Sequence, residues 1–147
     1  MVNFTTITTL LAIAAAATAL PGKGLHARQA DVSCLDNEGV FIAPGIVSEA
    51  VDCINELASK GSQDCTAGLA TSFCRRGNTQ ITGIFRKAAA GGPDASKTTT
   101  TTCQDVAQAA GRVMDFCSQG SGNVKGQTTA FVNTDMLVDI RLNDPSQ

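Results

Sequence analysis

Six cysteines are the residues of this sequence whose type and number point most directly to chemistry. They are Cys34, Cys53, Cys65, Cys74, Cys103 and Cys117. Zinc sites and thiol redox centres typically carry a C-x-x-C pair, which this sequence lacks. An even number of cysteines in a short secreted chain is instead typical of a disulfide framework. The cysteines therefore predict three structural bridges, with no metal and no cofactor.

Catalytic constellations are hard to assemble from the remaining residues. The only histidine, His26, lies in the N-terminal leader, and if this leader is removed the mature chain has no Ser-His-Asp or Cys-His pair. Asp36 with Glu38, and Asp135 with Asp139, are the carboxylate pairs that could carry acid–base chemistry. Solvated charge at turns and on an exposed strand face explains them more simply. Phosphate-binding loops and dinucleotide fingerprints are missing, and the sequence predicts a protein that is not an enzyme.

Two of the cysteines stand at the ends of one predicted helix, residues 103–117. Its apolar positions continue one helical face between Cys103 and Cys117, at Val106, Ala110, Val113 and Met114. Fourteen residues separate the two sulfurs in the sequence, which is roughly 21 Å along a helix axis. A disulfide needs Cα atoms within about 7 Å. Each of the two cysteines must therefore bond a different, distant segment.

The pairing that this constraint favours is one of fifteen connectivities that six cysteines allow. Cys53 lies at the edge of the apolar stripe of a second predicted helix, where it could meet the first helix. We therefore expect Cys53 to pair with Cys103, Cys34 with Cys117 and, by elimination, Cys65 with Cys74. Each bridge would stabilise the fold by roughly 2–4 kcal/mol.

The N-terminus has the layout of a secretory signal peptide. Residues 1–19 combine an apolar run with a small-residue end, and the run is shorter than the roughly 20 residues that a membrane span requires. Residues 20–29 are expected to form a pro-segment or flexible leader, with a protease site after Arg28 as one alternative and an uncut tail as the other. We therefore expect a single extracellular domain, residues 30–147, with no transmembrane segment.

Charge and composition exclude further classes of partner. Of eleven Lys and Arg, two lie in the leader, which leaves nine against thirteen Asp and Glu, a net charge near −4. An acidic chain without a basic run is a poor ligand for phosphate backbones, so no nucleic acid is expected. The sequence has no Trp and no Tyr, the flat rings on which sugars and bases commonly stack. We expect a monomer.

Hydrophobic periodicity orders the secondary structure along the domain. Helical spacing predicts helices at residues 48–60 and 103–117, the first ended by Gly61 and the second capped by Thr102 with Asp105 at its third position. Strands are predicted at residues 39–42, 80–85, 127–132 and 136–142, and loops at 66–73 and 86–102. This order predicts an α+β two-layer sandwich, with both helices on one face of a mainly antiparallel sheet. Threonines 98–102 are expected to form an extended, strand-like approach whose last member, Thr102, caps the helix, and O-glycosylation of these threonines is the alternative.

Three segments carry a resemblance to a known family. The segment CRRGNTQITGIF (74–85), the helix CQDVAQAAGRVMDFC (103–117) and GQTTAFVNTDMLVDI (126–140) resemble the fungal killer-toxin-like proteins of the smut-fungus killer protein four type. They are also similar to the related necrosis-inducing effectors typified by extracellular protein two of a tomato leaf-mould fungus. The resemblance covers residues 53–140 and rests on the cysteine spacing and the C-x-x-G-N turn. It implies a two-layer sandwich that acts outside the cell. The toxin, however, is basic and has more disulfides than six cysteines allow.

The function that these observations predict is that of a small secreted, non-catalytic effector or killer-toxin-like protein. Its partner would be a host or competitor protein or a membrane receptor. The predicted binding surface consists of loop residues with polar or basic side chains, Arg75, Arg76, Asn78, Arg86, Lys87 and Lys97. Ordinary solvated loops are the competing interpretation. A secreted inhibitor of an extracellular protease or hydrolase, which would present the bridged loop 66–73, is the alternative function.

Overall fold

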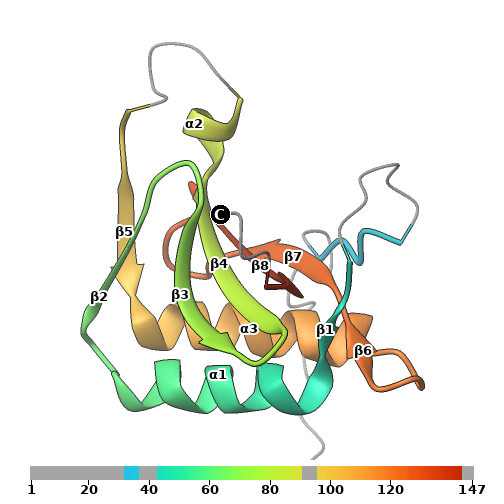
Figure 1. Cartoon of the computed structure of the whole chain (residues 1–147). Helices are drawn as coiled ribbons and strands as arrows, with labels where there is room; N and C mark the ends of the chain where they lie inside the picture. Colours follow the sequence, from blue (N-terminus) through green and yellow to red (C-terminus); the bar gives the residue numbers. More distant parts are fainter. Residues whose placement is uncertain (1–31, 37–42, 91–95, 144–147) are drawn as a thin grey trace, which may run out of the picture.

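The computed structural model describes residues 32–36, 43–90 and 96–143, and within them it shows an α+β fold of two layers (Figure 1). The elements, in chain order, are β1 (Gly45–Ile46), α1 (Val47–Ser59), β2 (Asp64–Ala67), β3 (Thr71–Arg76), β4 (Thr79–Phe85), α2 (Arg86–Ala89), β5 (Thr99–Thr102), α3 (Cys103–Cys117), β6 (Asn123–Val124), β7 (Gly126–Thr129) and β8 (Met136–Leu142). The predicted fold class is confirmed. The predicted signal peptide, the leader and the strand at 39–42 lie outside the described residues.

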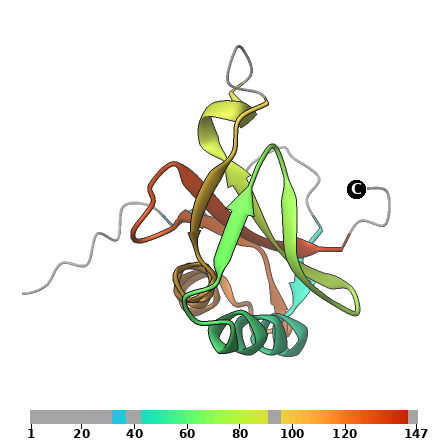
Figure 2. The ribbon, with the colours of Figure 1, turned by 90° about the vertical axis from the view of Figure 1, so that its left-hand side faces the viewer.

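One layer is a four-stranded antiparallel sheet in the order β3-β4-β8-β7. The other layer consists of α1, which contacts β3 and β4, and α3, which contacts β7 and β8. Figure 2 shows the two helices side by side on one side of the strands. Ile81, Val138 and Ile140 point from the sheet into the shared core and are fully buried, as are Leu57 of α1 and Val113 of α3. No helix among the described residues has the length and apolarity that a membrane crossing requires.

Two short ribbons lie beside this sheet, and they correct the predicted loops. β1 pairs with β6, and β2 pairs with β5. The segment 66–73 therefore belongs to two strands joined by a short turn, and the segment 86–102 contains α2 and β5. In the β2–β5 ribbon Thr66 lies opposite Thr100, and their hydroxyl oxygens are 2.8 Å apart. Threonine suits an extended strand because it is β-branched. The partner of this strand is distant in the sequence, since Thr66 and Thr100 are 34 residues apart.

Asp105 joins the start of α3 to the connection between β7 and β8. The backbone N–H of Asp105 donates to the Thr102 hydroxyl at 3.1 Å, which confirms the predicted helix cap. The Asp105 carboxylate, which is buried, accepts hydrogen bonds from the Thr101 hydroxyl at 2.6 Å and from the N–H of Phe131 at 2.9 Å. Because the backbone of Phe131 and Val132 turns toward Asp105, β7 ends at Thr129 and not at the predicted residue 132.

The disulfides confirm one predicted pair and correct two. The bridges are Cys34–Cys117, Cys53–Cys74 and Cys65–Cys103, with Cα–Cα distances of 5.1, 5.6 and 5.0 Å. The two cysteines of α3 bond different distant segments, as predicted, and Cys34–Cys117 is the predicted pair. The predicted pairs Cys53–Cys103 and Cys65–Cys74 are wrong.

The segment that follows α1 explains this exchange of partners. It runs past the first residue of α3, where the Cys103 N–H donates to the Gln63 carbonyl at 2.8 Å and the Gln104 N–H to the Gly61 carbonyl at 3.0 Å. Cys65 comes two residues later and therefore reaches Cys103. Cys53 lies in the middle of α1, fully buried, where β3 packs across the helix and brings Cys74 to it.

Gly83 in the central strand β4 provides a test of this packing. A Cβ at this position would overlap the ring of Phe73 and would lie 2.9 Å from the Cβ of Ala67. We expect Gly83→Ala to lower the free energy of unfolding by about 1–3 kcal/mol, because overpacking forces the neighbouring side chains to move. Urea denaturation measures it.

Gly111→Ala is the matched control, since a Cβ on Gly111 in α3 would meet nothing within 4 Å. Alanine favours a helix, so this variant should be neutral or stabilised by up to about 1 kcal/mol. Equal stabilities of the two variants would contradict the packing of Phe73 on β4.

Candidate functional site

A surface groove of about 480 Å³ runs along β3. Its lining consists of Glu56 from α1 and residues 70–76 from β3 and the turn before it. β3 is the last strand of the main sheet, and among the described residues its only strand partner is β4. The other end strand, β7, differs, because Ser33 forms a β-bridge with Gln127 there. The groove therefore follows the open edge of the sheet.

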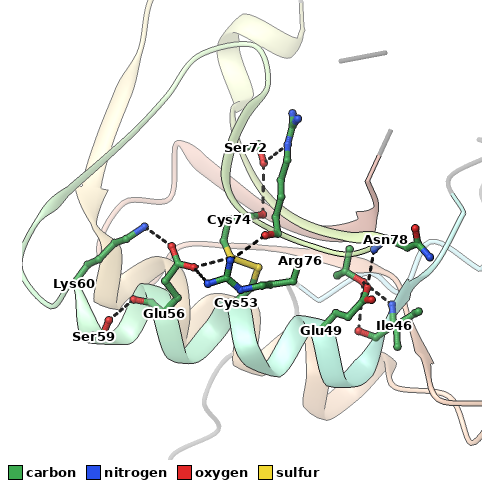
Figure 3. Close-up of a disulfide and its surroundings, with 12 residues drawn as sticks. Ile46, Glu49, Cys53, Glu56, Ser59, Lys60, Ser72, Cys74, Arg76 and Asn78 are labelled. Carbon is green, nitrogen blue, oxygen red and sulfur yellow. Dashed lines mark hydrogen bonds and ion pairs between the residues drawn. A yellow bond between two sulfur atoms is a disulfide. The ribbon is translucent and has the colours of Figure 1, made fainter. Parts of the chain in front are cut away.

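Charged side chains gather at the α1 end of the groove (Figure 3). The Glu56 carboxylate is paired with the Arg76 guanidinium through one oxygen and with the Lys60 ammonium, at 2.9 Å, through the other. The hydrogen bond from Lys60, together with the positive charges of Lys60 and Arg76, lowers the pKa of Glu56 against the opposing effect of burial. Arg75 is also exposed here, and its Nε donates to the Ser72 hydroxyl at 3.0 Å. Two cations, Lys60 and Arg76, thus hold the Glu56 carboxylate, and Arg75 adds a third positive charge beside Ser72.

Three residues on one face of α1 hold β3 and the following turn in place. Glu49, Cys53 and Glu56 are spaced by four and three residues, which puts them in a row along the helix. Glu49 accepts hydrogen bonds from the Asn78 N–H at 2.9 Å and from the Thr79 hydroxyl at 2.8 Å. Cys53 forms the bridge to β3, and Glu56 binds Arg76 (Figure 3). The basic end of β3 is thereby fixed at three points.

The turn between β3 and β4 is fitted closely to the same helix. Gly77 has a φ of +48°, a left-handed conformation that glycine adopts without steric cost. A side chain at Gly77 would also overlap the Glu49 carboxylate. Glycine at the centre of R-G-N therefore suits this turn. The turn in its fitted position fixes the directions of the flanking residues Arg76 and Asn78.

The structure divides the six residues of the predicted binding surface between the two ends of β4. Arg75, Arg76 and Asn78 lie at the α1 end, while Arg86, Lys87 and Lys97 lie at the opposite end, near α2 and the start of β5 (Figure 1). β4 has seven residues, so about 20 Å separates the groups. The six residues therefore form two separate groups, and only the first lies at the groove.

The second group contacts the β7–β8 connection. The Lys87 ammonium is 3.0 Å from the Asp135 carboxylate, and the Arg86 guanidinium donates to the Thr134 carbonyl at 3.4 Å. Sequence reasoning had missed Glu56 and Lys60. Their spacing of four residues was visible as a helical ion pair, but nothing local showed that Arg76 would join it.

Of the two candidate carboxylate pairs, only Asp135 with Asp139 lies within the described residues, and this pair does not form. Glu38 lies outside the described residues, and its predicted partner Asp36 lies 3.6 Å from the Lys125 ammonium. Asp135 is bound to Lys87 at the surface, whereas Asp139 lies four residues further along, within β8. Four residues of extended strand span about 13 Å, which is too far for acid–base cooperation.

Asp139 is buried, which corrects the prediction that it lies on a solvated strand face. Its side chain is 4% exposed, on the face of the sheet opposite the helices, and its carboxylate is 3.3 Å from the Arg141 guanidinium. Thr82 and Gln127 flank it in the pairing register of β4 and β7. Burial raises the pKa of Asp139 to about 6, against the opposing attraction of Arg141.

Metal and thiol chemistry find no support in the part of the chain that the structure describes. Among these residues no group of three His, Cys, Asp or Glu is placed to hold a metal ion, and all six cysteines are bridged. What the groove offers is backbone hydrogen-bonding groups along a strand edge and fixed positive charge at one end. This chemistry is suited to binding.

The raised pKa of Asp139 predicts how the free energy of unfolding changes with pH. The folded state binds the proton more tightly than the unfolded state, so the stabilisation is complete below about pH 4 and is lost as the pH rises toward 6. The loss amounts to about 3 kcal/mol. Asp139→Asn keeps the shape of the side chain and removes its titration. The difference in free energy of unfolding between wild type and variant should therefore change with pH in this window. Urea denaturation at pH 3.5 and pH 7 measures it.

Asp135→Asn is the control, because Asp135 is at the surface and paired only with Lys87. Its pH profile should follow that of the wild type. A constant difference in stability between Asp139→Asn and the wild type at both pH values would contradict the burial of an ionising carboxylate.

Comparison with known proteins places the chain in a family. A search of curated proteins finds no match. The model of a family described as a domain of unknown function, DUF8794, matches residues 29–142. The matched segment contains all six cysteines, the groove and every described helix and strand. The protein therefore belongs to the DUF8794 family, whose fold in this chain is a triply bridged sandwich with an open, basic sheet edge.

Proposed function

We propose that this protein is a small secreted effector or killer-toxin-like protein, which acts without catalysis by binding a host or competitor molecule in the α1–β3 groove. The observation that carries the proposal is the groove itself, where a strand edge that no described strand covers meets the cations of Lys60, Arg75 and Arg76 on a scaffold fixed by a disulfide. Loops and edges that a rigid scaffold positions are where binding residues concentrate.

Other features support secretion and an extracellular target. Three disulfides suit an oxidising compartment, and the first nineteen residues have the pattern of a signal peptide. The resemblance of residues 53–140 to killer toxins and necrosis-inducing effectors supports the same role. The acidic composition separates this chain from the basic toxin.

An infiltration and growth assay with the purified, oxidised protein tests the proposal. We expect leaf necrosis or arrest of a competing fungus, and we expect Arg75→Gln with Arg76→Gln to raise the required dose about tenfold or more, since two charge-assisted contacts are lost. Arg86→Gln with Lys87→Gln, at the far end of β4, should leave the dose unchanged. Reduced and alkylated protein should be inactive.

The assay distinguishes failure of the proposed role from failure of the proposed binding surface. Absence of any response to the wild-type protein, on hosts and on fungi, would refute the proposed role. A response that both double variants retain would show that the groove is not the working surface. Circular dichroism of each variant confirms that its fold is intact before the assay.

A second function, inhibition of a secreted protease or hydrolase, is favoured by one observation. The turn between β2 and β3 exposes 57% of the Leu69 side chain. Cys65 on one side of this turn is bridged to α3, and Cys74 on the other side is bridged to α1. A rigid turn with a projecting apolar side chain is what an inhibitor inserts into a protease pocket.

Titration of common secreted proteases with the protein tests this alternative. Inhibition by the wild type that Leu69→Asp abolishes would establish it, because a charge at the tip cannot enter an apolar pocket without a partner. Full protease activity at a large molar excess of the protein would exclude it for those enzymes.

A further inference from the structure

We infer that the ligand of the groove is an extended acidic peptide segment, which adds to β3 as a fifth strand of the main sheet. The inference rests on the proposed function, because it takes the groove as the binding surface. It names what the groove would recognise: backbone amides and carbonyls along β3, and carboxylates at its arginine end.

The backbone of β3 identifies the conformation of the ligand. One edge of β3 pairs with β4, from Thr71 opposite Gly83 to Arg76 opposite Thr79. Its other edge lines the groove, and no described strand pairs with it. An unpaired edge presents alternating N–H and C=O groups that another extended chain can satisfy. A helix or a compact small molecule would leave most of these groups without partners.

The neighbouring strand leaves this edge accessible. β2 and β3 share the turn at residues 68–70, yet β2 pairs with β5 and diverges from β3 toward α1 (Figure 1). β3 has six residues, so it can pair with a ligand segment of about the same length, spanning roughly 20 Å. A bulge between Ser72 and Cys74 interrupts the regular pairing to β4 in the middle of the strand, and it limits the register in which a ligand can align.

Charge identifies the side chains of the ligand. Arg75 and Arg76 are exposed at the end of β3, where Arg76 forms a cluster with Lys60 around the carboxylate of Glu56 and Arg75 lies beside Ser72. Glu56 shows what this cluster binds, since its two oxygens are divided between Arg76 and Lys60. A ligand carboxylate can use further guanidinium donors, because arginine offers five N–H groups in a fixed fork. A basic ligand would be repelled.

The competing explanation is protective. Natural sheets often blunt an edge with charged side chains and bulges that prevent association with other strands, and β3 has both. The two explanations make opposite predictions for an acidic strand: protection would reject every extended peptide, whereas recognition would select the acidic one.

Hydrogen exchange of the ¹⁵N-labelled, oxidised protein with designed peptides tests the inference. The probe is an acetylated, amidated eight-residue peptide of alternating valine and glutamate. A second peptide has lysine in place of glutamate, and a third keeps glutamate but carries an N-methyl group on every residue. We expect the acidic peptide to slow exchange of amides in residues 71–76. The lysine peptide should bind about tenfold more weakly or worse. The N-methylated peptide should not protect these amides, because the methyl groups remove its N–H donors on both edges and keep its carbonyls away from the strand.

Variants of the protein show where the acidic peptide binds. The double variant Arg75→Gln with Arg76→Gln should bind the peptide about tenfold more weakly. The double variant Arg86→Gln with Lys87→Gln should bind it as the wild type does. Unchanged exchange in residues 71–76 with every peptide at about millimolar concentration, or protection confined to other strands, would overturn the inference.

The bioassay separates this result from the proposed function. Activity that is lost with Arg75→Gln and Arg76→Gln, in a protein that binds no extended peptide, would retain the groove as the working surface and overturn the ligand class. Peptide binding on β3 in a protein without biological activity would support the ligand class and refute the effector role.

Discussion

A single helix tethered at both ends is the constraint on which the rest of this fold depends. Cys103 at the first position of α3 is bridged to β2, and Cys117 at its last position is bridged to Cys34 near the start of the described chain. The bridges close loops of 38 and 83 residues in sequence separation, for which chain entropy predicts roughly 4 kcal/mol of stabilisation each. Between them, Val106, Ala110 and Val113 are fully buried. The covalent ties thus hold in register a helix whose apolar face completes the core.

The helix α3 stabilises the candidate site through its contact with α1. α3 packs along α1, and α1 holds β3 by Glu49, Cys53 and Glu56. The edge strand therefore does not depend on β4 alone for its position. Ordering a flexible edge at the moment of binding would cost conformational entropy, and a strand that is already ordered avoids much of this cost. The disulfide framework serves the groove as well as the fold.

Local patterns in the sequence predicted the elements whose signals are local. The helix at 103–117 and the strand at 136–142 have the predicted bounds, and Thr102 caps the helix as expected. Helical spacing, strand alternation and capping all act within a few residues, so one sequence is enough to detect them. The β2–β5 pairing and two of the disulfides were not predicted correctly, because they join segments whose approach depends on the path of the whole chain.

Asp139 shows the same limit within one strand. Alternation along β8 predicted a buried face of Met136, Val138, Ile140 and Leu142, of which the first three are buried and Leu142 is exposed. It cannot show whether the opposite face is also covered, since a period of two distinguishes two faces but does not measure the exposure of either. The carboxylate was consequently assigned to solvent, although Asp139 is buried beside Arg141.

The candidate site was predictable in its charges and unpredictable in its geometry. Arg75 and Arg76 stand out in a sequence with few basic residues, but they were grouped with Arg86 and Lys87, which the length of β4 places at the opposite end of the strand. Only the sheet order shows that β3 is an edge, and only its packing on α1 brings Glu56 to Arg76. Binding at this groove needs both properties together, because an edge without charge would accept any strand, and charge without an edge would hold no strand in register.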